Sequence, residues 1–97
     1  MTTKPIAIII RKIIRHNHTE SNALSYTLDK LTDRITEVHA AVSEHDIDVE
    51  FGLIRRFGIR SAPVLIFERN GAEITRLTGL VSADEIMDAI DYAKVEY

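Results

Sequence analysis

The sequence predicts an α/β domain: a mixed four-stranded sheet with three helices, in the order β-α-β-α-β-β-α. Three observations lead to this prediction. An isoleucine-rich run, a helical stripe and a second short strand follow one another, which is typical of a parallel β-α-β unit. An Asn-Gly pair between two later strands indicates an antiparallel hairpin. Finally, a serine with a glutamate three residues later indicates a capped last helix.

Composition indicates one soluble domain spanning residues 1–97. The chain has 97 residues, 45% of them apolar and 28% charged, which suffices for one hydrophobic core. A net charge of −3 argues against nucleic acid as a partner. No apolar run approaches the roughly 20 residues of a membrane helix, and the opening residues do not resemble a signal peptide.

The cysteine count carries more information about function than any other feature of the composition. The chain has none, which excludes disulfides, thiolate metal ligands and any thiol chemistry by this protein. A protein without disulfides is most often intracellular, so we expect it in the cytoplasm.

The first predicted strand covers Pro5 to Ile14, where isoleucines indicate burial on both faces. Arg11 and Lys12 suggest that its end emerges toward solvent. A helix is predicted from Glu20 to about Arg34. Its apolar stripe has a period near 3.6 and consists of Leu24, Leu28, Leu31 and Ile35. Either Thr19 or Ser21 is expected to cap it.

The second strand is predicted from Glu37 to Val42, because Val38, Ala40 and Val42 alternate. A single longer helix through Val38 and Val42 is the alternative.

A short helix is expected next, with Asp48 as its cap and Gly58 after its last residue. Phe51, Ile54 and Phe57 would form its core face.

The second half of the chain carries clear local signals. A strand begins at Pro63, and Asn70–Gly71 forms the hairpin turn. The strand "AEITRLT" then ends at Gly79. Ser82 and Glu85 form the capping box of the last helix. The apolar side of this helix consists of Ile86, Met87, Ile90 and Ala93.

The run "RRFGIRSAPVLIFERNGAEITRLTGLVSADEIMDAI" resembles the C-terminal half of the thioredoxin superfamily. The resemblance is clear from about Ile47 to Ala93 and implies a thioredoxin-like fold. It also implies a cis bond between Ala62 and Pro63. In this family the cis proline lies beside the redox motif, and the residue before it offers its backbone to a bound peptide or glutathione. A trans proline that starts an edge strand is the alternative.

The family's Cys-x-x-Cys motif corresponds here to His18-Thr19-Glu20-Ser21. Dithiol exchange requires thiolates, so thiol-disulfide oxidoreductase activity is excluded. Lys12 matches the position of a buried acid in thioredoxins, which agrees with loss of the redox chemistry. More simply, Lys12 is the exposed end of a strand.

The resemblance therefore implies a redox-inactive binding module without a cofactor. Another protein or an extended peptide would occupy the cis-proline groove by strand addition. Three further cations, Arg11, Lys12 and Arg15, would give this groove a basic rim. The residues expected to bind are His18, Thr19, Glu20, Ser21, Arg60, Ala62 and Pro63.

Two other interpretations concern the same segment. In an extended backbone, His16, His18 and Glu20 would share one face and offer zinc ligands, although no fourth ligand is evident. Alternatively, the His18 imidazole would activate the Ser21 hydroxyl in an enzyme or accessory subunit that binds glutathione or another small thiol. Ser21 is more simply a helix residue, so no catalytic residue is assigned. The sequence does not indicate the oligomeric state.

Overall fold

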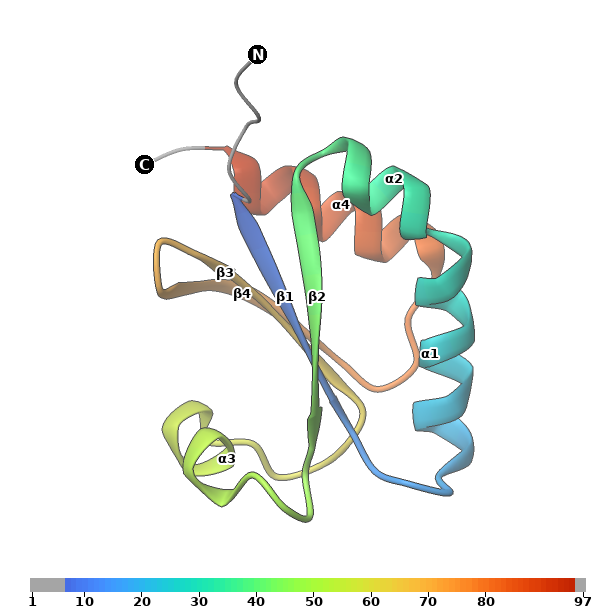
Figure 1. The fold of residues 1–97 in the computed structure, drawn as a ribbon, viewed down its shortest axis with the longest axis vertical. Coiled ribbons are helices and arrows are strands. Elements are labelled where there is room, and N and C mark those ends of the chain that lie inside the picture. The colour runs from blue at the N-terminus through green and yellow to red at the C-terminus, as the bar shows by residue number, and fades with distance from the viewer. Residues whose placement is uncertain (1–6, 96–97) are drawn as a thin grey trace.

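The computed structural model describes residues 7–95 and shows a four-stranded sheet with four helices in that range (Figure 1). Within those residues no helix is long and apolar enough to cross a membrane. The elements in chain order are β1 (Ile8–Ile14), α1 (Thr19–Lys30), α2 (Thr32–Glu37), β2 (Ala40–Asp46), α3 (Phe51–Phe57), β3 (Val64–Arg69), β4 (Ala72–Thr78) and α4 (Ala83–Lys94).

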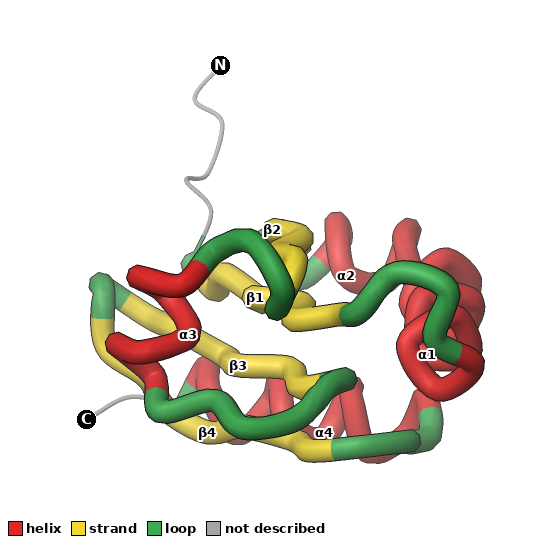
Figure 2. The backbone as a smooth tube through the Cα atoms, turned by 90° about the horizontal axis from the view of Figure 1, so that it is seen from below, coloured by secondary structure: helices red, strands yellow, loops and turns green. Residues whose placement is uncertain are grey.

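The strands lie in the order β2-β1-β3-β4. β1 and β2 are parallel, whereas β3 runs antiparallel to both β1 and β4. α1, α2 and α4 cover one face of the sheet, and the short α3 covers part of the other (Figure 2). The predicted mixed four-stranded sheet is confirmed, with its first two strands parallel and its last two antiparallel. The structure differs in having one helix more than the three predicted.

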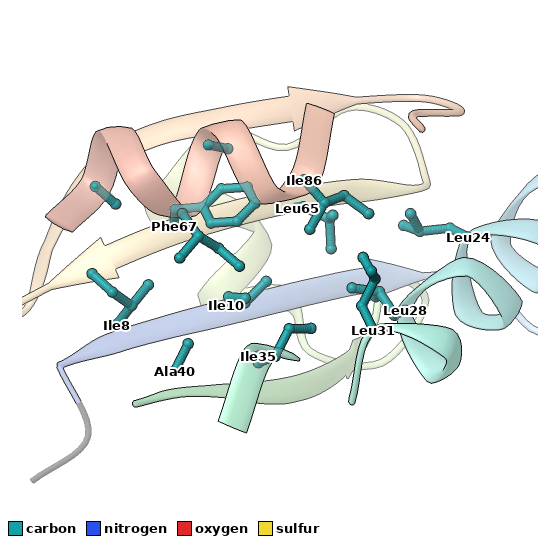
Figure 3. Close-up of a cluster of buried hydrophobic side chains, with 13 residues drawn as sticks. Ile8, Ile10, Leu24, Leu28, Leu31, Ile35, Ala40, Leu65, Phe67 and Ile86 are labelled. Carbon is teal, nitrogen blue, oxygen red and sulfur yellow. The ribbon is translucent and has the colours of Figure 1, made fainter. Parts of the chain in front are cut away.

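The larger of two hydrophobic clusters lies between the sheet and its three covering helices (Figure 3). Phe67 is its largest fully buried side chain. Strand alternation explains which residues meet there, because side chains at every second position of β1 and β3 point to the same face. The labelled members are Ile8, Ile10, Leu24, Leu28, Leu31, Ile35, Ala40, Leu65, Phe67 and Ile86.

The single helix predicted from Glu20 to about Arg34 is divided at Leu31. Leu31 has φ −98° and ψ 3°, and its N–H bonds to carbonyls of the last turn of α1. The Thr32 hydroxyl donates to the Asp29 carbonyl at 2.8 Å and competes with the helical backbone for this acceptor. The apolar stripe continues across the break, since Leu31 and Ile35 are both buried. The spacing of the apolar residues therefore does not indicate that the helix is divided at Leu31.

The second strand begins later than predicted. The range Glu37 to Val42 is wrong, because α2 extends to Glu37 and β2 starts at Ala40. The alternative of one helix continuing through Val42 is also wrong. His39 has φ 59° and reverses the chain between the two elements. A left-handed residue at this place is usually glycine, so the sequence carries no signal for the turn.

The short third helix ends as predicted but starts differently. Gly58 follows it with φ 63°. Asp48 is not its cap; the cap position is Glu50, whose side chain makes no capping bond. The predicted core face is also partly wrong, since Phe51 is 66% exposed. The side chains that pack on the second cluster come from Leu53, Ile54 and Phe57.

The local signals of the second half are confirmed. Asn70 and Gly71 both have positive φ, which is the geometry of a type I′ hairpin turn. Ser82 and Glu85 form a reciprocal capping box at the start of α4. The first strand is described from Ile8, so its predicted start at Pro5 lies outside the described residues.

Candidate functional site

Two loops meet at one end of the sheet. Ile13 of β1 pairs with Val64 of β3, so the end of β1 lies beside Pro63. The chain then leaves β1 for the segment that carries His18. Both figures of the backbone show this segment and the loop before β3 at the same end of the molecule (Figures 1 and 2). The peptide bond between Ala62 and Pro63 is cis.

His18 caps α1, a position for which the sequence favoured Thr19 or Ser21. Its Nδ1 accepts the Ser21 N–H at 3.3 Å and lies 2.9 Å from Ser21 Oγ. Because Nδ1 accepts a backbone N–H in this arrangement, the ring N–H lies at Nε2. The Ser21 hydroxyl therefore donates to Nδ1, while Ser21 Oγ accepts the Arg15 N–H at 3.1 Å.

The hydrogen bonds and burial of Ser21 indicate a structural role. Its side chain is fully buried at 1% exposure, so a substrate cannot reach the hydroxyl in this conformation. Its neighbours Thr19 and Glu20 are exposed, and His18 is half-buried. The accessible part of the four-residue motif thus consists of Thr19, Glu20 and the Nε2 edge of His18.

The loop before β3 leaves backbone groups unpaired. Arg60 is exposed, Ala62 is half-buried and Pro63 is fully buried. The Pro63 carbonyl accepts the N–H of Gly79 at 2.8 Å, which ties the loop to the end of β4. Among residues 7–95, neither Ser61 nor Ala62 takes part in a backbone–backbone hydrogen bond.

Lys12 is buried, contrary to the expectation that it marks an exposed strand end. It is 8% exposed, and its Nζ lies 2.7 Å from Glu44 Oε1 and 3.1 Å from Ser25 Oγ. The ammonium is therefore held between β2 and α1, beneath the first helix. It does not contribute to a basic rim.

Two further cations of the predicted rim are also paired within the chain. Arg11 forms an ion pair with the buried carboxylate of Glu68. Arg15 makes two hydrogen bonds to Asp48, at 3.1 and 3.2 Å, and this partner raises the pKa of Arg15. Of the four expected cations, Arg60 alone has no ion-pair partner within the described residues.

The structure does not bring together the zinc ligands considered from the sequence. Asn17 has φ 54°, so the backbone between His16 and His18 is not extended. His16 lies 3.1 Å from Asp46, while His18 Nδ1 caps the helix. Within residues 7–95, no group of three potential metal ligands converges.

A network of polar side chains on the face of the sheet that α3 partly covers was not predicted from the sequence. Arg11 Nη1 lies 3.2 Å from His45 Nε2, and His45 Nδ1 lies 3.0 Å from Glu50 Oε1. This last hydrogen bond lowers the pKa of Glu50. Glu68 and His45 are both buried. In the sequence, Glu68 and His45 stand out only as a charged and a polar residue within predicted strands. This pattern does not indicate which residues their side chains contact.

Comparisons with solved structures agree with this architecture. A mutant thioredoxin from Halobacterium salinarum matches with a TM-score of 0.81 and 21% identity over 94% of this chain and 79% of that chain. Thioredoxin-2 of a malaria parasite, a component of the parasite's protein secretion machinery, matches with a TM-score of 0.80 and 21% identity, over 88% and 82%. Fasciola hepatica thioredoxin matches with a TM-score of 0.81 and 14% identity, over 93% and 84%.

These likenesses establish the fold. A comparison with curated proteins finds no match. The model of the thioredoxin-like domain, however, matches residues 10–94, which is nearly the whole chain. The protein therefore belongs to the thioredoxin-like family and lacks the cysteines of its redox motif.

Proposed function

We propose that this redox-inactive thioredoxin-like protein binds another protein, which presents an extended peptide to the groove beside Pro63. The observation that carries the proposal is the unpaired backbone of Ser61 and Ala62, next to the cis bond. Unpaired N–H and C=O groups in a loop that is tied down on one side are suited to pair with an added strand. Arg60 and Ala62 would form one wall of the groove, and the buried Pro63 would hold this loop in its conformation.

The second wall would come from the start of α1. His18, Thr19 and Glu20 offer the accessible atoms there, while Ser21 holds the turn from inside. In this proposal Ser21 contributes by positioning His18 and does not contact the peptide. The cytoplasm is the proposed location, because a chain without cysteine gains nothing from an oxidising compartment.

The charge of the groove indicates which peptide fits it. Arg60 is exposed and unpaired within the described residues, whereas Arg15 is neutralised by Asp48. Glu20 on the opposite wall is exposed as well. A peptide with an acidic residue toward Arg60 and a neutral or basic residue toward Glu20 would match both walls.

The test is capture of partners by the immobilised full-length protein. Pro63→Ala and the double variant His18→Ala/Ser21→Ala should lose the captured proteins, and Arg60→Ala should weaken capture. Arg34→Ala, on the exposed side of α2, is the matched control and should capture as wild type does. Thermal unfolding of each variant checks that it is folded. Equal capture by all folded variants would show that this groove is not the site.

The alternative, an enzyme or accessory subunit that binds glutathione or a small thiol, has a separate test. Its support is the 2.9 Å contact between His18 Nδ1 and Ser21 Oγ; against it stands the burial of Ser21. Glutathione titration should leave the amide NMR signals of Ala62 and Ser21 unmoved. Saturable shifts would favour the alternative. An insulin-reduction assay should give no activity.

A further inference from the structure

A second surface, apart from the region around Pro63, lies along one edge of the sheet. β2 is one of the two border strands, and β4 is the other (Figure 2). A border strand presents a row of unpaired backbone groups, which makes it a template for another strand.

The hydrogen-bond pattern shows which groups are free. The Ala7 N–H donates to the His39 carbonyl, and the Ile47 N–H donates to the Ile14 carbonyl. In a parallel ladder every second residue bonds to the neighbouring strand, so odd-numbered residues of β2 face β1. Even-numbered residues face outward. Asp46 agrees with this pattern, because its N–H donates to Glu50 Oε2 at 3.2 Å.

The outward-facing backbone groups of Val42 and Glu44 are left unpaired and both residues are exposed, whereas Ala40 is covered, at 4% exposure. Neither Val42 nor Glu44 takes part in a backbone hydrogen bond outside the β1–β2 ladder within the described residues. The segment "AAVSE" contains no lysine, no proline and no bulge, so its protection as an edge is limited to the charge of Glu44. Val42 is 42% exposed.

A pocket of about 350 Å³ lies beside this edge, on the face covered by α1 and α2. Its volume is in the range of sites that hold compact organic groups. Apolar side chains from both helices and from β2 form its walls: Leu28, Ile35, Ala40 and Val42. The side chains of an added strand alternate between faces, so every second one would point toward this pocket.

The charges beside the pocket favour a basic partner. Asp29 lines the pocket, and Glu44 has a side chain that is 56% exposed. Lys12 is the cation in the lining, but its Nζ is already bound to Glu44 and Ser25. An incoming cation would therefore meet two carboxylates and one ammonium that is already paired.

We propose that the β2 edge and its adjacent pocket bind an extended segment of another protein, one that presents a large apolar side chain and, two residues along the strand, a lysine or arginine on the same face. The backbone of Val42 and Glu44 would pair with this segment. An apolar side chain of the segment would enter the pocket, and its cation would lie near Asp29 and Glu44.

The probe is a capped ten-residue peptide in which valine and lysine take turns on one face of the strand and threonine fills the positions between them, titrated into the ¹⁵N-labelled full-length protein. Saturable amide shifts are expected at Ala40, Val42 and Glu44. A peptide with glutamate in place of lysine should bind at least tenfold more weakly. Absence of saturable binding, or shifts centred on Ala62 instead, would overturn the proposal.

Two variants separate the backbone from the pocket. Val42→Pro removes an outward N–H and keeps the pairing with β1, so it should weaken binding at least tenfold. Because Val42 also lines the pocket, Val42→Ala is its control: it changes the same wall, keeps the N–H and should weaken binding less. Thr36→Phe places a ring at the pocket and should do the same. Thr27→Phe is the matched control, since Thr27 makes the same hydroxyl bond to a carbonyl four residues earlier but does not line the pocket.

The titration also identifies a competing occupant. If the shifts at Ala40, Val42 and Glu44 appear on concentrating the protein without peptide, the edge pairs with a second copy and the partner assignment is wrong. If Thr36→Phe and Thr27→Phe weaken binding equally, the pocket takes no part in recognition. Binding of the peptide by Val42→Pro with wild-type affinity would refute the strand pairing.

Discussion

The ion pair between Arg11 and Glu68 gives the sharpest test of how this sheet is stabilised. The Glu68 side chain is 5% exposed and the Arg11 side chain 21% exposed. Removing the cation with Arg11→Met leaves a buried carboxylate without its counter-charge. Breaking a buried pair in this way typically destabilises a protein by about 3–5 kcal/mol. We expect Arg11→Met to reach the lower part of this range.

The reverse substitution should cost less. In Glu68→Leu, Arg11 keeps its contact with His45 at 3.2 Å and lies 5.9 Å from the centroid of the Phe57 ring. Its partial exposure also lets water reach the guanidinium. Loss of one charged hydrogen-bond partner then costs about 1–3 kcal/mol. The double variant Arg11→Met/Glu68→Leu replaces both charges by apolar groups, and its stability should lie within about 1 kcal/mol of wild type.

Urea and thermal unfolding of the full-length protein measure these differences. For a domain of this size, about 3 kcal/mol corresponds to a fall in Tm of roughly 12–24 °C. The control is Glu73→Gln, because the Arg76–Glu73 pair on β4 is about one third exposed and should contribute at most about 1 kcal/mol. The reasoning is refuted if the double variant loses as much stability as the two single variants together.

Three further predictions follow from other contacts. The His45 hydrogen bond lowers the pKa of Glu50, so this bond stabilises the fold above the ordinary pKa of 4.5. The stabilisation is lost as the pH falls through the lowered pKa. In Glu50→Gln the free energy of unfolding, measured with urea at several pH values, should therefore fall less at acidic pH. Ser82→Ala removes one bond of the α4 capping box and should cost about 1 kcal/mol in chemical unfolding. Phe67→Ala should cost about 3–5 kcal/mol, whereas Phe51→Ala should leave Tm nearly unchanged.

The parts of the fold that were predictable depend on local rules. Asn70–Gly71 and Ser82 act within a few residues of themselves, so their turn and cap can be predicted from spacing alone. The errors in element boundaries before β2 fall at Leu31 and His39, where the backbone changes direction without glycine or proline. The Thr32 hydroxyl bonds to the Asp29 carbonyl beside this break. Hydrophobic periodicity contains no information about such a side-chain hydrogen bond.

Prediction of the candidate site was limited by charge pairing across the chain. The sequence shows four cations near the two loops, but not that Lys12 meets Glu44 or that Arg15 meets Asp48. Each pair joins residues about thirty positions apart, so only the folded sheet reveals it. An expected basic rim is thereby reduced to Arg60. Sequence spacing is a poor guide to local charge where parallel strands bring distant residues together.

Burial and hydrogen bonding within the chain explain why residues 18–21, at the position of the redox motif, are not arranged for nucleophilic catalysis. A nucleophile needs an accessible atom and a base with a free lone pair. Ser21 Oγ is buried, and the Nδ1 lone pair of His18 is occupied by the first turn of α1. What stays available is backbone at Ala62 and the exposed side chains of Thr19 and Glu20. In the proposed function such groups would form hydrogen bonds with a partner without activating it, so a change in Ser21 should alter binding only through the shape of the turn.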